Sequence, residues 1–167
     1  MPRFILIGPP GSGKSTIGRA LAKRLEVDFT DTDTLIAARA GKSITEIFID
    51  DGEAKFREME EAIVLESITS VDGVLALGGG AILSERVQSA LKELPGVIFL
   101  DVSISNAAPR VGFNKERPLL MGNPRSQWIA LMEKRRPIYE ALAKYTVSTD
   151  NSKPNEVVER ILHEVAA

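Results

Sequence analysis

Short runs of apolar residues alternate along this chain with longer stretches in which apolar residues recur every three or four positions. The short runs are typical of buried strands, and the recurring pattern is typical of amphipathic helices. Alternating strands and helices favour a mainly parallel sheet that is covered by helices on both faces. Five strands are predicted, at about residues 3–7, 27–30, 74–77, 97–102 and 146–148.

The helical stretches carry recognisable start and stop signals. Gly41 follows one short helical pattern, and Ser43 with Glu46 forms a capping box that begins the next one. Pro137 lies inside a further helical stretch, where it removes a backbone donor and is expected to kink or divide the helix. Helices are predicted at about residues 14–25, 35–40, 44–49, 53–70, 85–94, 105–111, 127–143 and from 154 onward.

One segment, residues 112–124, breaks every periodic pattern and is interpreted as a mobile lid. The chain has 167 residues, which is enough for one domain with a core and too few for two. Residues 1–167 are therefore expected to form a single domain that holds every site.

Composition narrows the classes of function. A net charge of −2 provides no basic field for nucleic acid, and no apolar run is long enough to span a membrane. The absence of cysteine and the single histidine, His163, argue against thiolate and histidine-cluster metal sites. The first apolar run ends at Gly8, so no signal peptide is predicted, and a cysteine-free chain fits a cytoplasmic location. A monomer is expected, because no extended apolar stripe remains after the helices are assigned to the sheet.

The clearest motif is Gly8-Pro-Pro-Gly-Ser-Gly-Lys14-Ser15, a full match to GxxxxGK(S/T) between a predicted strand and a predicted helix. Its glycines let successive backbone N–H groups face phosphate oxygens, and the helix N-terminus adds partial positive charge. Lys14 can reach the outer phosphates and Ser15 can coordinate Mg²⁺. A glycine-rich turn without a ligand is the alternative. Phosphate contacts are predicted for Gly11, Ser12, Gly13, Lys14, Ser15 and Thr16.

Two carboxylates, Asp31 and Asp33, follow the second predicted strand. Alternate residues of a strand share a face, so both side chains can face one crevice, one toward a metal and the other toward an acceptor hydroxyl. The alternative is that Asp33 only caps the following helix. A GTPase is disfavoured, because Asn114-Lys115-Glu116 is followed by Arg117 where guanine recognition needs a carboxylate.

Three arginines have open interpretations from spacing alone. Arg57 could pair with Glu61 at i, i+4 on a helix surface. Arg135 could be a solvated helical charge, and Arg117 could be an ordinary loop cation.

Taken together, these residues resemble the shikimate kinase family. The resemblance spans nearly the whole chain in the order and spacing of that family. It rests on the phosphate loop, Asp31-Thr32-Asp33, Gly52-Glu53 followed by Phe56-Arg57, Leu77-Gly78-Gly79-Gly80, Arg117-Pro118-Leu119-Leu120, and Lys134-Arg135 before Pro137-Ile138-Tyr139. It implies a three-layer α/β/α P-loop kinase fold with a five-stranded parallel sheet of order 2-3-1-4-5, a mobile lid at about 112–124 and an acid-binding helical region at about 33–61.

The resemblance also implies the reaction, which is phosphorylation of the 3-hydroxyl of shikimate by ATP with Mg²⁺ as cofactor. Catalytic roles fall on Asp33, Lys14 and Arg117, and Mg²⁺ would be held by Ser15 and, through water, by Asp31. The acid would be bound by Asp33, Arg57, Gly78, Gly79, Gly80 and Arg135, with Glu60 orienting Arg57. Nucleotide contacts beyond the phosphate loop would come from Arg110, Arg117, Lys153 and Pro154. For Lys153 and Pro154, a solvated cation and a helix-start proline are alternatives.

Two other functions stay open from the sequence. One is a kinase for another small hydroxylated acceptor such as gluconate, which would be favoured if Arg57 and Arg135 faced solvent. The other is a nucleotide-binding module without an acceptor.

Overall fold

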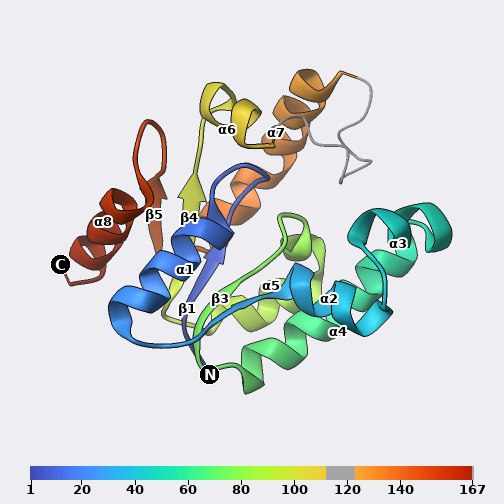
Figure 1. The fold of residues 1–167 in the computed structure, drawn as a ribbon, viewed down its shortest axis with the longest axis horizontal. Coiled ribbons are helices and arrows are strands. Elements are labelled where there is room, and N and C mark those ends of the chain that lie inside the picture. Colours follow the sequence, from blue (N-terminus) through green and yellow to red (C-terminus); the bar gives the residue numbers. More distant parts are fainter. Residues whose placement is uncertain (112–122, 167) are drawn as a thin grey trace.

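The computed structural model of the chain describes residues 1–111 and 123–166, and its centre is one sheet of five parallel strands (Figure 1). The strand order is β2-β3-β1-β4-β5, which confirms the predicted order. The strands are β1 (Pro2–Ile7), β2 (Phe29–Asp31), β3 (Gly73–Ala76), β4 (Val97–Asp101) and β5 (Tyr145–Ser148).

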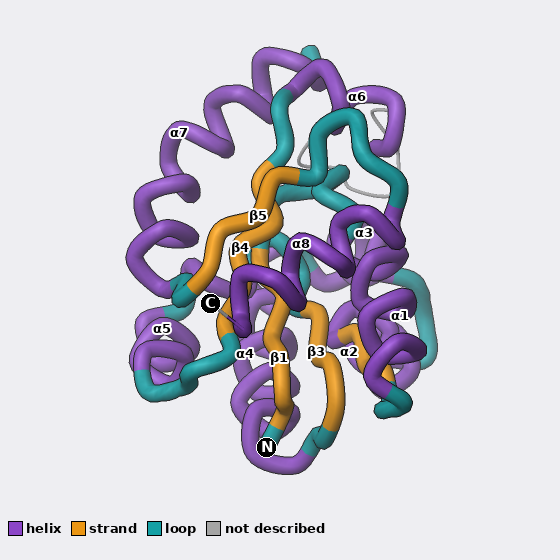
Figure 2. Tube along the Cα trace, turned by 90° about the vertical axis from the view of Figure 1, so that its left-hand side faces the viewer, coloured by secondary structure: helices purple, strands orange, loops and turns teal. Residues whose placement is uncertain are grey.

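Helices cover both faces of the sheet, because alternate residues of each strand point to opposite sides (Figure 2). In β1, Ile5 and Ile7 pack on the side of α4, α5 and α7, whereas Phe4 and Leu6 pack on the side of α1 and α8. The helices are α1 (Lys14–Leu25), α2 (Thr32–Ala40), α3 (Ile44–Asp51), α4 (Glu53–Ser70), α5 (Glu85–Lys92), α6 (Ile104–Val111), α7 (Pro124–Leu142) and α8 (Pro154–Ala166), with a short 3-10 helix η1 (Ala81–Leu83).

A third cluster of apolar residues joins α2, α3 and α4 beside the sheet. Its fully or nearly fully buried members are Ile36, Ile47, Phe56 and Ile63. The predicted capping box at Ser43 and Glu46 is present and begins α3. This cluster fixes the start of α4, which carries Arg57, against the rest of the protein.

Two helices that carry candidate site residues, α2 and α7, differ from the predicted bounds. Helix α2 begins at Thr32 rather than near residue 35, because the Asp31 side chain caps it. Helix α7 begins at Pro124 and runs unbroken through Pro137, so the expected division of this helix is wrong. Arg135 and Tyr139, before and after the proline, are both buried, so the inner face of the helix stays packed across Pro137. Residues 112–122 of the predicted lid, Arg117 included, lie outside the described residues.

Within residues 1–111 and 123–166, no helix has the length and apolar character needed to cross a membrane.

Candidate active site

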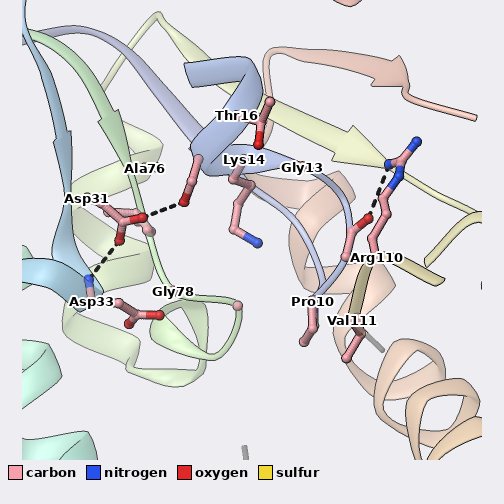
Figure 3. Close-up of a pocket in the computed structure, with 14 residues that line it drawn as sticks. Pro10, Gly13, Lys14, Thr16, Asp31, Asp33, Ala76, Gly78, Arg110 and Val111 are labelled. Atoms are coloured by element: carbon pink, nitrogen blue, oxygen red, sulfur yellow. Dashed lines mark hydrogen bonds between the residues drawn. The ribbon is translucent and has the colours of Figure 1, made fainter. Parts of the chain in front are cut away.

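The carboxyl ends of β1, β2 and β3 meet around a pocket of about 420 Å³ (Figure 3). The phosphate loop, the β2–α2 turn and the glycine turn after β3 form its walls, and the end of α6 closes one side. This position is the usual ligand site of open parallel sheets. The lining residues are Pro10, Gly11, Gly13, Lys14, Ser15, Thr16, Asp31, Asp33, Ala76, Leu77, Gly78, Gly79, Arg110 and Val111.

The phosphate loop leads directly from β1 into α1. Gly11 and Gly13 have φ angles of 84° and 90°, a region that side-chain-bearing residues rarely adopt. Gly13 caps α1 without a side-chain hydrogen bond, so the first N–H groups of the helix are available to an anion. The Lys14 Nζ atom donates to the carbonyl oxygens of Gly8 and Pro9 at 2.7 and 3.1 Å.

Asp31 and Asp33 both line the pocket, on the side opposite Arg110 (Figure 3). The predicted reason, strand alternation, is wrong, because Asp33 already lies in the first turn of α2. Asp31 Oδ1 accepts a hydrogen bond from the Asp33 backbone N–H at 2.9 Å, so Asp31 is the helix cap and the capping alternative for Asp33 is wrong. The Ser15 hydroxyl donates to Asp31 Oδ2 at 2.5 Å.

The three glycines after β3 allow charged side chains to approach the backbone. A β-carbon at Gly78 would lie 2.6 Å from Asp33 Oδ1, and one at Gly79 would lie 3.5 Å from Arg135 Nη1. A β-carbon at Gly80 would overlap the Arg57 guanidinium. The turn therefore brings together three predicted acid-binding side chains that are far apart in the sequence.

Arg57 is held by a buried carboxylate on its own helix. Its Nη1 atom donates to Glu60 Oε1 at 2.7 Å, and Glu60 is only 2% exposed. Pairing of Arg57 with Glu61 is wrong, since Glu61 accepts instead from Ser84 at 2.6 Å and from Arg86 at 3.3 Å. The proposed orienting role of Glu60 toward Arg57 has this geometric support.

Arg135 is 7% exposed, so a solvated helical charge is the wrong interpretation. Burial lowers the pKa of Arg135, and the neighbouring Arg57 cation lowers it further, while the Tyr139 hydrogen bond opposes the shift. Arginine nevertheless remains protonated at neutral pH. Among residues 1–111 and 123–166, no carboxylate forms an ion pair with Arg135. Two cations beside the Gly79–Gly80 backbone are suited to bind the carboxylate of a small acid.

The guanidiniums of Arg57 and Arg135 do not line the phosphate pocket itself. The Arg135 guanidinium lies next to Gly79, and Gly79 lines the phosphate pocket. Arg57 and Gly80 line a neighbouring pocket of about 530 Å³ between α4 and η1. Asp33 thus lines the phosphate pocket with Lys14, Arg135 lies beside the Gly79 face that approaches Gly8 and Pro10, and Arg57 lies at the neighbouring pocket.

The predicted nucleotide-base contacts are brought together only in part. Arg110 lines the phosphate pocket and donates to Gly11 O at 3.2 Å and to Thr149 O at 2.9 Å, so it links the phosphate loop to the loop after β5. Lys153 and Pro154 begin α8 at exposed positions and do not line this pocket. Pro154 is the first residue of α8 and Lys153 precedes it, so contact with a nucleotide base stays a prediction for both.

Three residues at the site carry no prediction from the sequence. Thr32 Oγ1 accepts from the Gly78 N–H at 3.2 Å, Trp128 Nε1 donates to Pro10 O at 2.9 Å, and the Tyr139 hydroxyl donates to Gly79 O at 2.6 Å. Trp128 and Tyr139 are spaced for one helix face with Arg135, and a polar aromatic on a core face needs a partner. This spacing is the sequence feature that could have indicated a hydrogen-bonding role for Trp128 and Tyr139.

A metal ion could be held beside the phosphate loop. Ser15 Oγ and the Asp31 carboxylate offer hard oxygen ligands, and Mg²⁺ commonly takes one or two such groups together with substrate phosphates. No group of three or more His, Cys, Asp and Glu residues suited to a metal occurs in the described part of the chain. The residues present therefore fit Mg²⁺ bound together with a nucleotide.

A phosphate loop between β1 and α1, a parallel sheet of order 2-3-1-4-5 and carboxylates facing the loop define a P-loop kinase. Comparison with known proteins narrows this class. The model of the family described as "Shikimate kinase" matches residues 10–166, and this chain belongs to the shikimate kinase family.

Individual relatives agree with that assignment. The chain is 50% identical to a shikimate kinase of Thermobifida fusca over 168 residues, covering 99% of this chain and 96% of the relative. A solved shikimate kinase from Acinetobacter baumannii, in complex with shikimate, is 34% identical with a TM-score of 0.94, covering 98% and 92% of the two chains. A gluconokinase from Sinorhizobium meliloti is 22% identical with a TM-score of 0.58 and shares the fold alone.

Proposed function

We propose that this protein transfers the terminal phosphoryl group of ATP to the 3-hydroxyl of shikimate, giving shikimate 3-phosphate and ADP. The observation that carries the proposal is the glycine turn at residues 78–80, which holds Asp33, Arg57 and Arg135 at its surface and borders the phosphate loop through Gly79 and Pro10.

Recognition of the acid is proposed to use the two arginines. Their forked N–H groups match the two oxygens of a carboxylate, and both already lie next to the Gly79–Gly80 backbone. Asp33, against Gly78, would accept hydrogen bonds from ring hydroxyls at the end nearer the phosphate loop. Gly78, Gly79 and Gly80 let the ring approach the backbone without a side chain in the way.

Transfer is proposed to depend mainly on alignment and charge. In a loose phosphoryl-transfer transition state, the attacking oxygen is barely bonded, so a strong base is not required. Asp33 would orient the 3-hydroxyl and take its proton. Lys14 would leave its own loop carbonyls to contact the phosphates, and Arg117, which lies outside the described residues, would add a second cation from the lid.

Mg²⁺ would be held by Ser15 and, through water, by Asp31, and it would neutralise phosphate charge. For the rest of the nucleotide, Gly11, Ser12, Gly13 and Thr16 would bind phosphates, and Arg110 would face the adenine with weaker contributions from Lys153 and Pro154. We further propose one domain, comprising core, acid-binding region at about 33–61 and lid at about 112–124. The enzyme would act as a monomer in the cytoplasm, in chorismate and aromatic amino acid biosynthesis, as the family resemblance implies.

The test is Mg²⁺-dependent ADP release from ATP with a panel of acceptors: shikimate, quinate, gluconate and nucleoside monophosphates. Release that depends strongly on shikimate supports the proposal. Preference for gluconate would favour the sugar-acid alternative, and nucleotide binding without any acceptor dependence would indicate a binding module.

A further inference from the structure

Tyr139 lies one helical turn beyond Arg135 on the buried face of α7. Residues four apart on a helix are neighbours, so the two side chains share one surface of the helix. The Tyr139 side chain is fully buried. A buried phenol normally has a hydrogen-bond partner, and its partners here belong to the acid-binding side of the site.

The Tyr139 side chain lies between the glycine turn and Arg135. It donates to the Gly79 carbonyl oxygen at 2.6 Å. Arg135 Nη1 approaches the same residue, at 3.5 Å from the position of a Gly79 β-carbon, and the neighbouring Tyr139 side chain opposes the effect of burial on the pKa of Arg135. A phenol has one proton to donate, so donation to Gly79 leaves the lone pairs of the oxygen available to the neighbouring Arg135 cation. One oxygen atom thus links the cation and the glycine turn.

The ring of Tyr139 is itself fixed by the sheet. It stacks on Phe99 of β4 with a centroid separation of 5.1 Å and an interplanar angle of 24°. The hydroxyl is therefore placed relative to the rigid core rather than to a loop.

Fixing the Gly79 carbonyl also fixes the next backbone donor. The peptide between Gly79 and Gly80 is planar and trans, so the Gly80 N–H points opposite to the carbonyl that Tyr139 holds. No residue in the described ranges accepts a hydrogen bond from the Gly80 N–H. Gly80 itself lies against the Arg57 guanidinium, where an acid carboxylate would also be bound.

We propose that Tyr139 is a positioning residue for acid recognition, which holds the Arg135 guanidinium and the Gly79–Gly80 peptide in the arrangement that binds the substrate carboxylate. The inference rests on the proposed function. It assigns Tyr139 no contact with ATP and none with the reacting hydroxyl, so its effect belongs to the affinity for the acid.

The direct test is Tyr139→Phe, with Tyr145→Phe on β5 as the matched control. Loss of hydrogen bonds that orient a charged group predicts about a tenfold rise in the shikimate Kd and KM. The ATP Kd and the kcat at saturating shikimate should not change, since uniform binding energy is lost. Tyr145→Phe should match the wild type in every measurement. A Tyr139→Phe protein with normal shikimate Kd, or with equal losses for ATP and shikimate, would overturn the inference.

A double-mutant cycle separates positioning from a general loss of structure. If Tyr139 acts through Arg135, Tyr139→Phe should change shikimate affinity little in an Arg135→Ala background, whereas additive losses would contradict the inference. Should Arg135→Ala not fold, shikimate amide serves as the second probe. Its neutral head group should bind the wild type and Tyr139→Phe equally, and a tenfold loss for the amide as well would contradict a role in carboxylate binding. Wild-type protein that fails to bind shikimate would instead refute the proposed function.

Discussion

Arg57 and Glu60 form a 2.7 Å ion pair in which the carboxylate is almost completely buried and the guanidinium lies against Gly80. The pair determines where the Arg57 cation sits before any ligand arrives. Its two members therefore have separable roles, since Glu60 orients the cation and Arg57 presents it to the glycine turn.

Arg57→Ala is expected to weaken shikimate binding by about 10- to 100-fold, the usual cost of losing hydrogen bonds to a charged group. ATP affinity should stay normal, because Arg57 does not line the phosphate pocket. Isothermal titration with each ligand measures both. The control is Arg86→Ala, which removes an exposed arginine paired with Glu61. Unchanged shikimate affinity in Arg57→Ala would exclude this residue from acid binding.

Arg135→Met is expected to stabilise the protein without ligand while weakening shikimate binding. Burial lowers the pKa of Arg135, so the folded state bears the cost of its charge at every pH below that lowered pKa, neutral pH included. An apolar side chain of similar length removes this cost. A gain of about 1 kcal/mol would raise Tm by roughly 2–4 °C.

The neighbouring variant Arg136→Met is the control for that experiment. Arg136 is paired with Asp101, so its replacement should bring no gain in Tm and leave shikimate affinity intact. Thermal denaturation with and without shikimate compares the two variants. A lower Tm for Arg135→Met would show that the favourable contacts of the Arg135 side chain outweigh the cost of burying the cation.

The sequence predicted the parallel sheet because its strands are continuous apolar runs, and it predicted the strand order only through the resemblance to the shikimate kinase family. It predicted Asp31 and Asp33 at the pocket for a reason that proved wrong, since helix α2 begins between them at Thr32. The start of α2 is decided by which aspartate caps the helix. A sequence does not show whether an aspartate caps a helix or faces a ligand.

The sequence also could not determine which side chains pair with one another. From spacing, Glu61 was as suitable a partner for Arg57 as Glu60, and only the packing of α4 against η1 and α5 directs Glu61 toward Ser84 and Arg86. Likewise, the sequence assigned no hydrogen-bond partner to Trp128 or Tyr139. Their hydrogen bonds to Pro10 and Gly79 join residues 118 and 60 positions apart, which no local pattern encodes.

Asp33→Asn is expected to lower kcat by about 100-fold or more, the lower range for loss of a positioned general base. The fold should be retained, since Asp31 rather than Asp33 caps α2. Steady-state ADP release and circular dichroism measure the two quantities. Asp28→Asn, at an exposed position before β2, should behave as the wild type. A kcat within a fewfold of the wild type would rule out the assigned role of Asp33.

Asp31→Asn is expected to raise the Mg²⁺ concentration needed for half-maximal activity by about 10- to 100-fold, as for loss of an outer-shell metal partner. Asparagine caps helices as well as aspartate does, so Tm should change little. A magnesium titration at saturating ATP tests the claim, and chelation of all Mg²⁺ should abolish activity in both proteins. An unchanged magnesium requirement would mean that another group serves the metal.

Trp128 is the sole tryptophan of the chain and bonds to the phosphate-loop carbonyl of Pro10. Its fluorescence should therefore change when ATP rearranges that loop, and much less when shikimate binds alone. Trp128→Phe should weaken ATP binding by roughly 3- to 10-fold, the loss of about one net hydrogen bond. If the emission stays constant at ATP concentrations that calorimetry shows to be saturating, Trp128 does not respond to a rearrangement of the phosphate loop.

The folded-back Lys14 ammonium has a consequence for ligand discrimination. The Lys14 ammonium already donates hydrogen bonds to the Gly8 and Pro9 carbonyl oxygens. A ligand that binds the ammonium must therefore replace these hydrogen bonds. Loss of these hydrogen bonds reduces the apparent affinity of every ligand that binds the Lys14 ammonium. A ligand with several clustered anionic oxygens compensates for this loss. The loop thereby favours ligands that carry phosphate groups over uncharged ligands of similar size.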